Sequence, residues 1–149
     1  MGLYYSPSTL FDDTSLWRKI INLHGRYLLS EKKVLVTGLA GKIGGIIRSN
    51  LSSKYALSGL DLKKVEGFQT TIGNLSNLDE ILPAFEGIDT VVHLAADPNH
   101  QGGWETNLDN NIVGTRNVYE AARISGVNRI IFASSNHAIG FYPLKDNPY

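Results

Sequence analysis

The sequence predicts a doubly wound α/β fold, in which helices cover both faces of a parallel sheet. Three observations lead to this prediction. Short apolar runs that suit buried strands alternate along the chain with segments of helical hydrophobic periodicity. A glycine-rich turn follows the first apolar run and opens a helix. The length of 149 residues fits one domain with a sizeable core.

The composition excludes several classes of partner. Fourteen basic and fourteen acidic residues give zero formal net charge, without a Lys/Arg block, so neither nucleic acid nor an anionic membrane is indicated. The chain has no cysteine and no His, Asp and Glu spacing typical of a metal site. No apolar run approaches the roughly 20 residues of a membrane helix, and the start lacks the order of a secretory signal. A soluble cytoplasmic protein is therefore expected.

Residues 1–30 precede the alternating pattern and are interpreted as an N-terminal extension of the α/β domain, which spans residues 31–149. Asp12, Asp13 or Thr14 can cap a short helix here. The apolar side of this helix would contain Leu16, Trp17, Ile20, Ile21 and Leu23. We expect the extension to be helical or partly disordered, and either docking or self-association would suit its apolar side.

The glycine-rich turn is the first candidate site. Residues 34–36 predict a strand buried on both faces, and Ile43, Ile46, Ile47 and Leu51 recur at helical spacing after the turn. Gly38, Gly41 and Gly44 have the spacing GxxGxxG, which permits a tight turn, close approach to a pyrophosphate and free helix N–H groups facing it. Turns and close helix packing also use glycine. The strand–turn–helix context favours a dinucleotide site.

An acidic residue supports this interpretation. Residues 55–60 form an apolar run that predicts the second strand, and Asp61 ends it, 23 positions after Gly38. A carboxylate at this place accepts hydrogen bonds from both hydroxyls of an adenosine ribose and repels a 2′-phosphate. NAD is therefore expected in preference to NADP, although Lys63 and Lys64 weaken the discrimination. The alternative is an exposed strand-end aspartate without a ligand.

The alternation continues beyond Asp61. Residues 68–72 predict a short third strand, and residues 76–79 resemble a capping box that opens the next helix. Pro83 predicts that this helix is short or kinked. Residues 90–96 predict a fourth buried strand whose small final residues leave room for a ligand against the backbone.

A longer helix is predicted from about residue 104 to 125. Its sheet-facing stripe is expected to contain Leu108, Ile112, Thr115, Tyr119 and Ala122. A fifth strand over residues 129–133 runs into Ser134 and Ser135. Right-handed crossovers bring the carboxyl ends of all strands to one edge of the sheet. One ligand along that edge could touch Gly38, Asp61, Asn74, Ala95 and Ser134.

These motifs together resemble the extended short-chain dehydrogenases/reductases, the NAD-dependent epimerase/dehydratase group, which implies a Rossmann-type sheet. The resemblance covers residues 33 to about 142. Besides the glycine turn and Asp61, the segments that carry it are residues 93–96, 111–122 and 132–135. Within the group, residues 134–143 look most like uronate dehydrogenases, which oxidise the C1 hydroxyl of hexuronic acids to a lactone with NAD. A nucleotide-sugar epimerase or dehydratase is the alternative enzyme. A noncatalytic NAD-sensing protein is the alternative from another class.

The resemblance implies roles for individual residues. Those implied at the cofactor, from pyrophosphate through adenosine to nicotinamide, are Gly38, Gly41, Lys42, Ile43, Asp61, Leu62, Asn74, Leu75, Leu94, Ala95, Ala96 and Asn111. Asn74 stands where the family has Asp, and its carbonyl can still accept from the adenine amino group. Ser135 aligns with the catalytic serine, and Asn136 and His137 would face the substrate.

Some of these residues also have simpler structural interpretations. Asn111 can instead pin a loop, and Ser134 and Ser135 can end a strand as turn formers. His93, inside the fourth strand, is interpreted as a hydrogen-bonded core residue rather than a catalyst.

The chemistry of the family uses a Tyr and a Lys spaced YxxxK on the following helix, where the Tyr is the acid/base. No YxxxK follows Ser135 in these 149 residues, and Tyr142 and Lys145 are spaced YxxK. The chain is therefore expected to bind NAD with little or no turnover, as a Rossmann fold truncated after about the fifth or sixth strand and lacking the family's substrate lobe. It would be either a truncated product of a longer enzyme or a short NAD-binding protein. Its exposed last strand favours self-association.

Overall fold

The computed structural model describes residues 32–99 and 103–135. The predicted N-terminal extension, and with it the predicted helix, lies outside the described residues, as do Asn136 and His137. In chain order the elements are β1 (Lys33–Thr37), α2 (Lys42–Leu51), β2 (Ala56–Asp61), β3 (Gln69–Ile72), α3 (Leu78–Ile81), the 3₁₀-helix η1 (Leu82–Phe85), β4 (Thr90–His93), α4 (Trp104–Asn107), the π-helix η2 (Leu108–Val113), α5 (Gly114–Ile124) and β5 (Arg129–Phe132).

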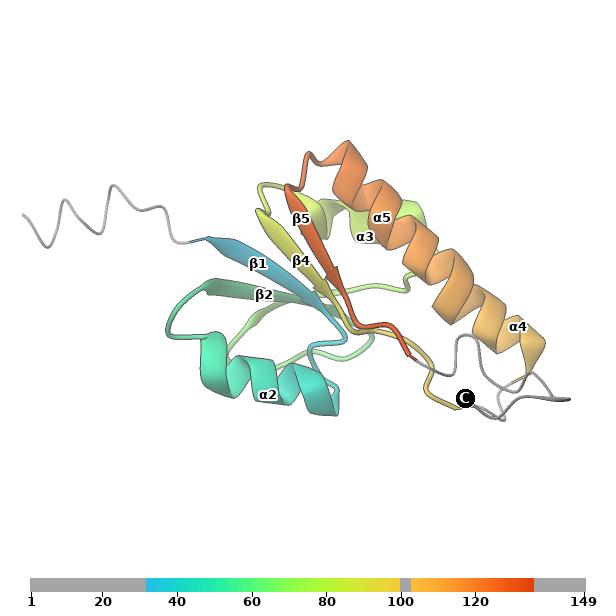
Figure 1. The fold of residues 1–149 in the computed structure, drawn as a ribbon, viewed down its shortest axis with the longest axis horizontal. Helices are drawn as coiled ribbons and strands as arrows, with labels where there is room; N and C mark the ends of the chain where they lie inside the picture. Colours follow the sequence, from blue (N-terminus) through green and yellow to red (C-terminus); the bar gives the residue numbers. More distant parts are fainter. Residues whose placement is uncertain (1–31, 100–102, 136–149) are drawn as a thin grey trace, which may run out of the picture. The chain divides into compact units, whose positions relative to one another are not determined.

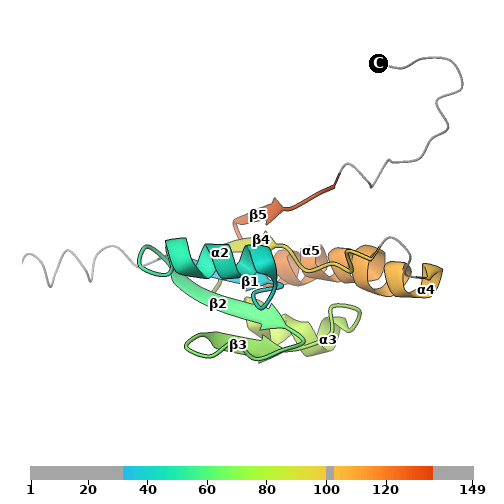
Figure 2. The ribbon, with the colours of Figure 1, turned by 90° about the horizontal axis from the view of Figure 1, so that it is seen from below.

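The strands form one parallel sheet in the order β3-β2-β1-β4-β5, which confirms the predicted fold class. Figure 2 shows the strands in this order, and Figure 1 shows the helices beside them. The chain runs outward from β1 to β3 and then crosses back to β4 on the other side of β1. The carboxyl ends of β1 and β4 therefore lie next to each other where the strand order reverses, which is where open α/β sheets bind ligands.

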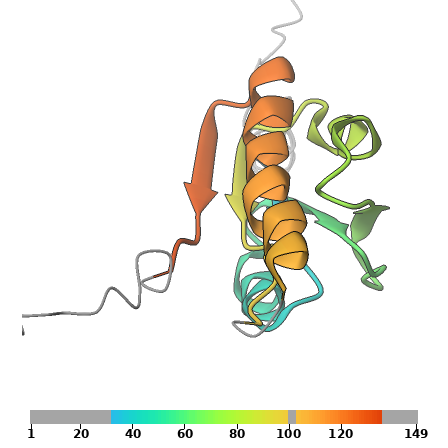
Figure 3. The same ribbon diagram turned by 90° about the vertical axis from the view of Figure 1, so that its right-hand side faces the viewer.

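Alternate residues of the strands pack on opposite faces of the sheet. On one face, Val34 and Val36 belong to a cluster with Leu39 and Val65, against which Ile47 of α2 packs. On the other face, Leu35 belongs to a cluster with residues of α3, η1 and α5. Figure 3 shows α5 running beside β4, with β5 at the edge of the sheet. Because helices cover both faces, residues 34–36 in the middle of the central strand β1 are all apolar.

The long helix predicted for residues 104–125 is wrong in detail, because it consists of α4, η2 and α5. The buried residues of α5 are Gly114, Asn117, Val118, Ala121 and Ala122. Of the predicted stripe, Ile112 is 52% exposed and Tyr119 is 45% exposed. A π-helical turn contains more residues than an α-helical turn, so a stripe drawn at one helical period across η2 loses its phase. Within α5 alone the buried positions have ordinary α-helical spacing.

Three further details of the helices bear on the predictions. In α2, Gly44 is the buried residue, whereas Ile43 and Ile46 are 57% and 63% exposed, so the predicted apolar side is only partly correct. The N-cap of α3 is Asn77, whose side chain accepts from the Glu80 N–H at 3.4 Å. The predicted effect of Pro83 is confirmed, because α3 ends after four residues and continues as the 3₁₀-helix η1.

Candidate functional site

The turn between β1 and α2 requires glycine at two places. Gly38 has φ +75°, and a Cβ there would lie 2.9 Å from the Ala95 nitrogen. A Cβ on Gly44 would lie 2.5 Å from the carbonyl oxygens of both Gly38 and Leu39. The Gly38 N–H donates to the Leu60 carbonyl at 2.9 Å and thereby ties the turn to β2. The glycines therefore hold α2, β2 and the end of β4 within backbone contact of one another.

Helix α2 begins without a side-chain cap. Its N-cap is Gly41, which has an extended backbone and no side chain that could accept from the first N–H groups. The first turn contains no acidic residue. The first N–H groups of a helix carry partial positive charge and have no partners within the helix. This start of α2, together with the glycines that let a ligand approach, fits an anionic group such as a phosphate.

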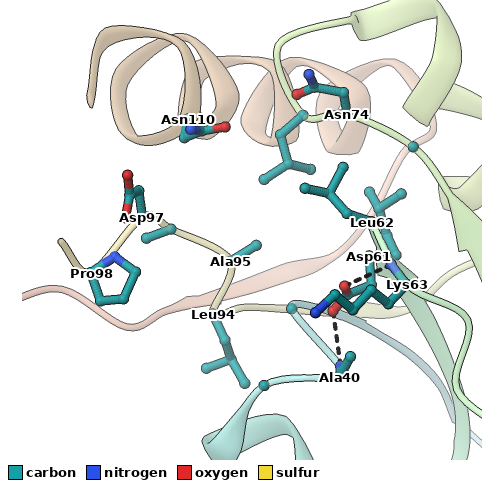
Figure 4. Close-up of a pocket in the computed structure, with 16 residues that line it drawn as sticks. Ala40, Asp61, Leu62, Lys63, Asn74, Leu94, Ala95, Asp97, Pro98 and Asn110 are labelled. Atoms are coloured by element: carbon teal, nitrogen blue, oxygen red, sulfur yellow. Dashed lines mark hydrogen bonds between the residues drawn. The ribbon is translucent and has the colours of Figure 1, made fainter. Parts of the chain in front are cut away.

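The carboxylate of Asp61 is held in place by two backbone N–H groups. Its Oδ2 accepts from Ala40 at 2.8 Å, and its Oδ1 accepts from Lys63 at 3.0 Å (Figure 4). These bonds connect the β1–α2 turn with the segment that follows β2. Each carboxylate oxygen can accept more than one hydrogen bond, so both retain capacity for a ligand hydroxyl. The Asp61 side chain thus has a fixed orientation and can still accept further hydrogen bonds.

Thr37, which is buried at the end of β1, holds the segment that directly follows β4. The Thr37 hydroxyl oxygen accepts from the Leu94 and Ala95 N–H groups, each at 3.2 Å. It also lies 2.7 Å from Nδ1 of His93, whose Nε2 lies 3.1 Å from Oγ1 of Thr115 on α5. His93 is fully buried and is therefore the hydrogen-bonded core residue that was predicted. Burial lowers the pKa of His93 from 6.5 to about 4.

The loop after β4 is pinned by Asn111. The side-chain oxygen of Asn111 accepts from the Asp97 N–H at 2.7 Å, and its amide nitrogen donates to the Asp97 carbonyl at 3.1 Å and to Oδ1 of Asn107 at 2.9 Å. These bonds place Asp97 and Pro98 opposite the ends of β1 and β2. The neighbouring Asn110 side chain faces the same space (Figure 4).

The loop after β3 is held in a similar way by a residue of α5. Asn117 is buried, and its side-chain nitrogen donates to the Leu75 carbonyl at 2.8 Å. Gly114 packs against the same residue, since a Cβ there would lie 2.9 Å from the Leu75 Cβ. Asn74 is exposed beside this contact, and its Oδ1 accepts from the Ser76 N–H at 3.0 Å. Asn117 therefore fixes the backbone next to Asn74.

These segments enclose a groove of about 470 Å³ along the carboxyl ends of β1, β2, β3 and β4. Nine residues predicted at the cofactor line it: Gly38, Gly41, Asp61, Leu62, Asn74, Leu75, Leu94, Ala95 and Ala96. The other lining residues are Ala40, Leu60, Lys63, Gly73, Asp97, Pro98 and Asn110. Most of these stand within two or three positions of a strand end, a signal that sequence reasoning could have used.

Four predicted residues do not line the groove: Lys42, Ile43, Asn111 and Ser135. Lys42 and Ile43 are exposed in the first turn of α2, directly after Gly41. Asn111 holds the loop that carries Asp97 rather than facing the groove. Ser135 is exposed three residues beyond the end of β5.

Within residues 32–99 and 103–135, no three His, Cys, Asp or Glu side chains lie together in a way that could hold a metal ion. The helices found there are all too short or too polar to cross a membrane.

The strand order, the glycine turn and the groove at the reversal point define a Rossmann-type α/β domain. The sequence profile of the NAD dependent epimerase/dehydratase family matches residues 34–147. The chain belongs to this family.

The relatives include sugar dehydrogenases and sterol-4-alpha-carboxylate 3-dehydrogenases, decarboxylating. L-arabinose 1-dehydrogenase (NAD(P)(+)) of Haloferax volcanii is 39% identical over 114 residues, covering 76% of this chain and 45% of the relative. Uronate dehydrogenase of Agrobacterium fabrum is 37% identical over 117 residues, covering 75% and 44%. The crystal structure of a mutant uronate dehydrogenase from Agrobacterium tumefaciens complexed with NAD superposes with a TM-score of 0.67 at 36% identity, covering 74% and 43%. The chain spans less than half the length of these relatives.

Proposed function

We propose that this domain binds NAD in the groove and forms the cofactor half of an NAD-dependent sugar oxidoreductase similar to uronate dehydrogenase. The observation that carries the proposal is the Asp61 carboxylate, which the Ala40 and Lys63 N–H groups orient at the groove. A carboxylate in this place suits the two hydroxyls of an adenosine ribose.

The lining residues fit the other parts of the cofactor. The pyrophosphate would lie beside Gly38 and Gly41 at the start of α2, whose first turn contains no acidic residue and whose N-cap makes no side-chain hydrogen bond. The adenine would lie toward Asn74 and Leu75. The nicotinamide half would pass Leu94, Ala95 and Ala96. In this arrangement Lys42 and Ile43 contribute backbone N–H groups rather than side chains, and Asn111 acts by holding the loop.

NAD, when bound, supplies the hydride acceptor for oxidation of a sugar. We propose that Ser135 holds the reacting hydroxyl and that Asn136 and His137 face the substrate, which would be a hexuronic acid oxidised at C1. Uronate dehydrogenases and other sugar dehydrogenases among the relatives support this substrate class. The 149 residues hold no YxxxK after Ser135, so we expect NAD binding with little or no turnover.

Calorimetric titration of the 149-residue chain with NAD and with NADP tests the binding proposal. The Asp61→Ala variant loses the charged acceptor, so its NAD dissociation constant should rise roughly tenfold or more. Its preference for NAD over NADP should shrink, because the charge that repels the 2′-phosphate is removed. Glu66→Ala, which removes an exposed carboxylate outside the groove, should leave both constants unchanged. Absence of saturable NAD binding by the unmodified chain would refute the proposal.

Turnover assays address the enzyme class. Glucuronate, galacturonate, L-arabinose and glucose 6-phosphate are tested as substrates with NAD, first on this chain and then on any longer form of the protein. Oxidation of the uronates by a longer form supports the proposed substrate class. Rapid turnover by the 149-residue chain itself would contradict the expectation of little or no turnover. Activity only toward nucleotide sugars would favour an epimerase or dehydratase.

A further inference from the structure

The hydrogen bonds around Thr37 determine where its hydroxyl proton lies. The hydroxyl oxygen has two lone pairs and one proton. It accepts from the Ala95 N–H, and from the Leu94 N–H, which it shares with the Thr37 carbonyl. Both lone pairs are thus occupied, and the proton must point to the remaining neighbour, Nδ1 of His93 at 2.7 Å. Nδ1 therefore accepts, and it carries no proton.

The other nitrogen of the ring completes the assignment. A neutral imidazole with an unprotonated Nδ1 has its proton on Nε2. Nε2 lies 3.1 Å from Oγ1 of Thr115, so His93 donates to α5 on one side and accepts from β1 on the other. The ring also stacks on Phe132 of β5, with centroids 5.4 Å apart and planes inclined by 22°. Contacts from three neighbouring elements, β1, α5 and β5, therefore fix both the position and the orientation of the imidazole.

We propose that His93 is a positioning residue for the cofactor groove. Its unprotonated Nδ1 holds the Thr37 hydroxyl in the one rotamer whose oxygen receives the Leu94 and Ala95 N–H groups. The proposal rests on the proposed function, because it names what shapes the wall that NAD would contact. Without an acceptor at Nδ1, the hydroxyl proton would turn elsewhere and compete with those N–H groups.

Close packing couples the position of Ala95 to the glycine turn. The Ala95 nitrogen lies where a Cβ on Gly38 would approach to 2.9 Å, so the end of β4 and the turn cannot move independently. Ala95 and Gly38 both line the groove. A shift of Ala95 toward the turn would therefore narrow the groove at the place where the cofactor backbone approaches closely.

Burial keeps the acceptor available. Because the pKa of His93 is lowered to about 4, the ring stays neutral at physiological pH and Nδ1 keeps its lone pair. Within residues 32–99 and 103–135, only the side chains of Thr37 and Thr115 hydrogen-bond to the ring nitrogens.

The first test needs no variant. Nitrogen-15 NMR of the imidazole at neutral pH should show Nδ1 as an unprotonated nitrogen and Nε2 as the protonated one. The opposite assignment, or a doubly protonated ring, would overturn the proposal. Hydrogen exchange of the Leu94 and Ala95 amides should be slow in the unmodified chain.

A matched pair of variants then tests the positioning effect. Asn and Leu have similar size, but only Asn places an acceptor near the position of Nδ1. In His93→Leu we expect faster exchange of the Ala95 amide and an NAD dissociation constant raised about three- to tenfold, the effect of one hydrogen bond. His93→Asn should lie closer to the unmodified chain in both measurements. Equal behaviour of the two variants would overturn the proposal.

A second pair covers the case in which His93→Leu fails to fold. Thr37→Val removes the hydroxyl, and Thr37→Ser keeps it, so only the valine variant should lose amide protection and NAD affinity. Where His93→Leu folds, adding Thr37→Val to it should cost less than Thr37→Val costs in the unmodified chain, because both changes remove the contact between Thr37 and His93. If the unmodified chain does not bind NAD, the proposed function fails, while the NMR and exchange results still decide the hydrogen-bond arrangement.

Discussion

Substitution of two adjacent glycines of α2 should change the stability in opposite directions. Gly44→Ala places a Cβ 2.5 Å from the Gly38 and Leu39 carbonyl oxygens and 2.7 Å from the Leu39 carbonyl carbon, all of them backbone atoms. The turn must open to admit the methyl group, and such overpacking costs about 1–3 kcal/mol. Gly45→Ala meets only the end of the Arg48 side chain, at 3.5 Å, which is ordinary contact. Ala is favoured over Gly within a helix by about 0.5–1 kcal/mol.

Urea unfolding followed by far-UV circular dichroism measures both free energies. We expect Gly44→Ala to lower the free energy of unfolding by about 1–3 kcal/mol and Gly45→Ala to raise it by about 0.5–1 kcal/mol. Calorimetry supplies a second readout, because an opened turn should also weaken NAD binding in Gly44→Ala but not in Gly45→Ala. If both variants were stabilised, or both bound NAD equally well, the close contact between α2 and the turn would be refuted.

Three further predictions concern the buried polar groups and a helix cap. The unfolded chain protonates His93 below pH 6.5 whereas the native ring stays neutral to about pH 4, so stability should fall across this window as pH decreases. The loss reaches about 3 kcal/mol by pH 4 in the unmodified chain and should be absent from His93→Asn, measured by urea unfolding over a pH series. Identical pH profiles of the two proteins would disprove it. Asn117→Leu leaves the Leu75 carbonyl without its partner and should cost about 1–3 kcal/mol in the same unfolding assay, while Asn128→Leu at an exposed position should change little. Asn77→Ala removes the cap of α3 and should cost about 0.5–1 kcal/mol in thermal unfolding, the low end for a cap because the bond is 3.4 Å long; an unchanged melting temperature would argue against it.

The glycine turn and Asp61 show what could be predicted well. Both depend on short-range spacing along β1, α2 and β2, and the structure brings both to the same groove. The place of Pro83 was also predictable, because the missing N–H of proline acts on its own helix. The sheet-facing stripe of the helix expected over residues 104–125 was not predictable. The π-helical turn η2 shifts the helical period, and no local residue pattern indicates such a turn.

Asn111 illustrates the limit for side-chain roles. The sequence left open whether Asn111 contacts a cofactor or pins a loop, and its hydrogen bonds run to the Asp97 backbone and to Asn107, as the second interpretation expects. The neighbouring Asn110 lines the groove instead. Consecutive residues of a helix point in different directions, so the sequence motif alone does not decide which of the two amides lines the groove.

The sequence by itself determined the alternation of strands and helices, the turn that glycine permits and the acidic residue at the end of β2. These features follow from backbone conformation and hydrophobic periodicity, which act over a few residues. Only the tertiary structure decided that Thr37 and His93 meet, although they stand 56 positions apart, and that two backbone N–H groups orient the Asp61 carboxylate. Such contacts depend on strand order and register, which set distances between segments that no local pattern encodes.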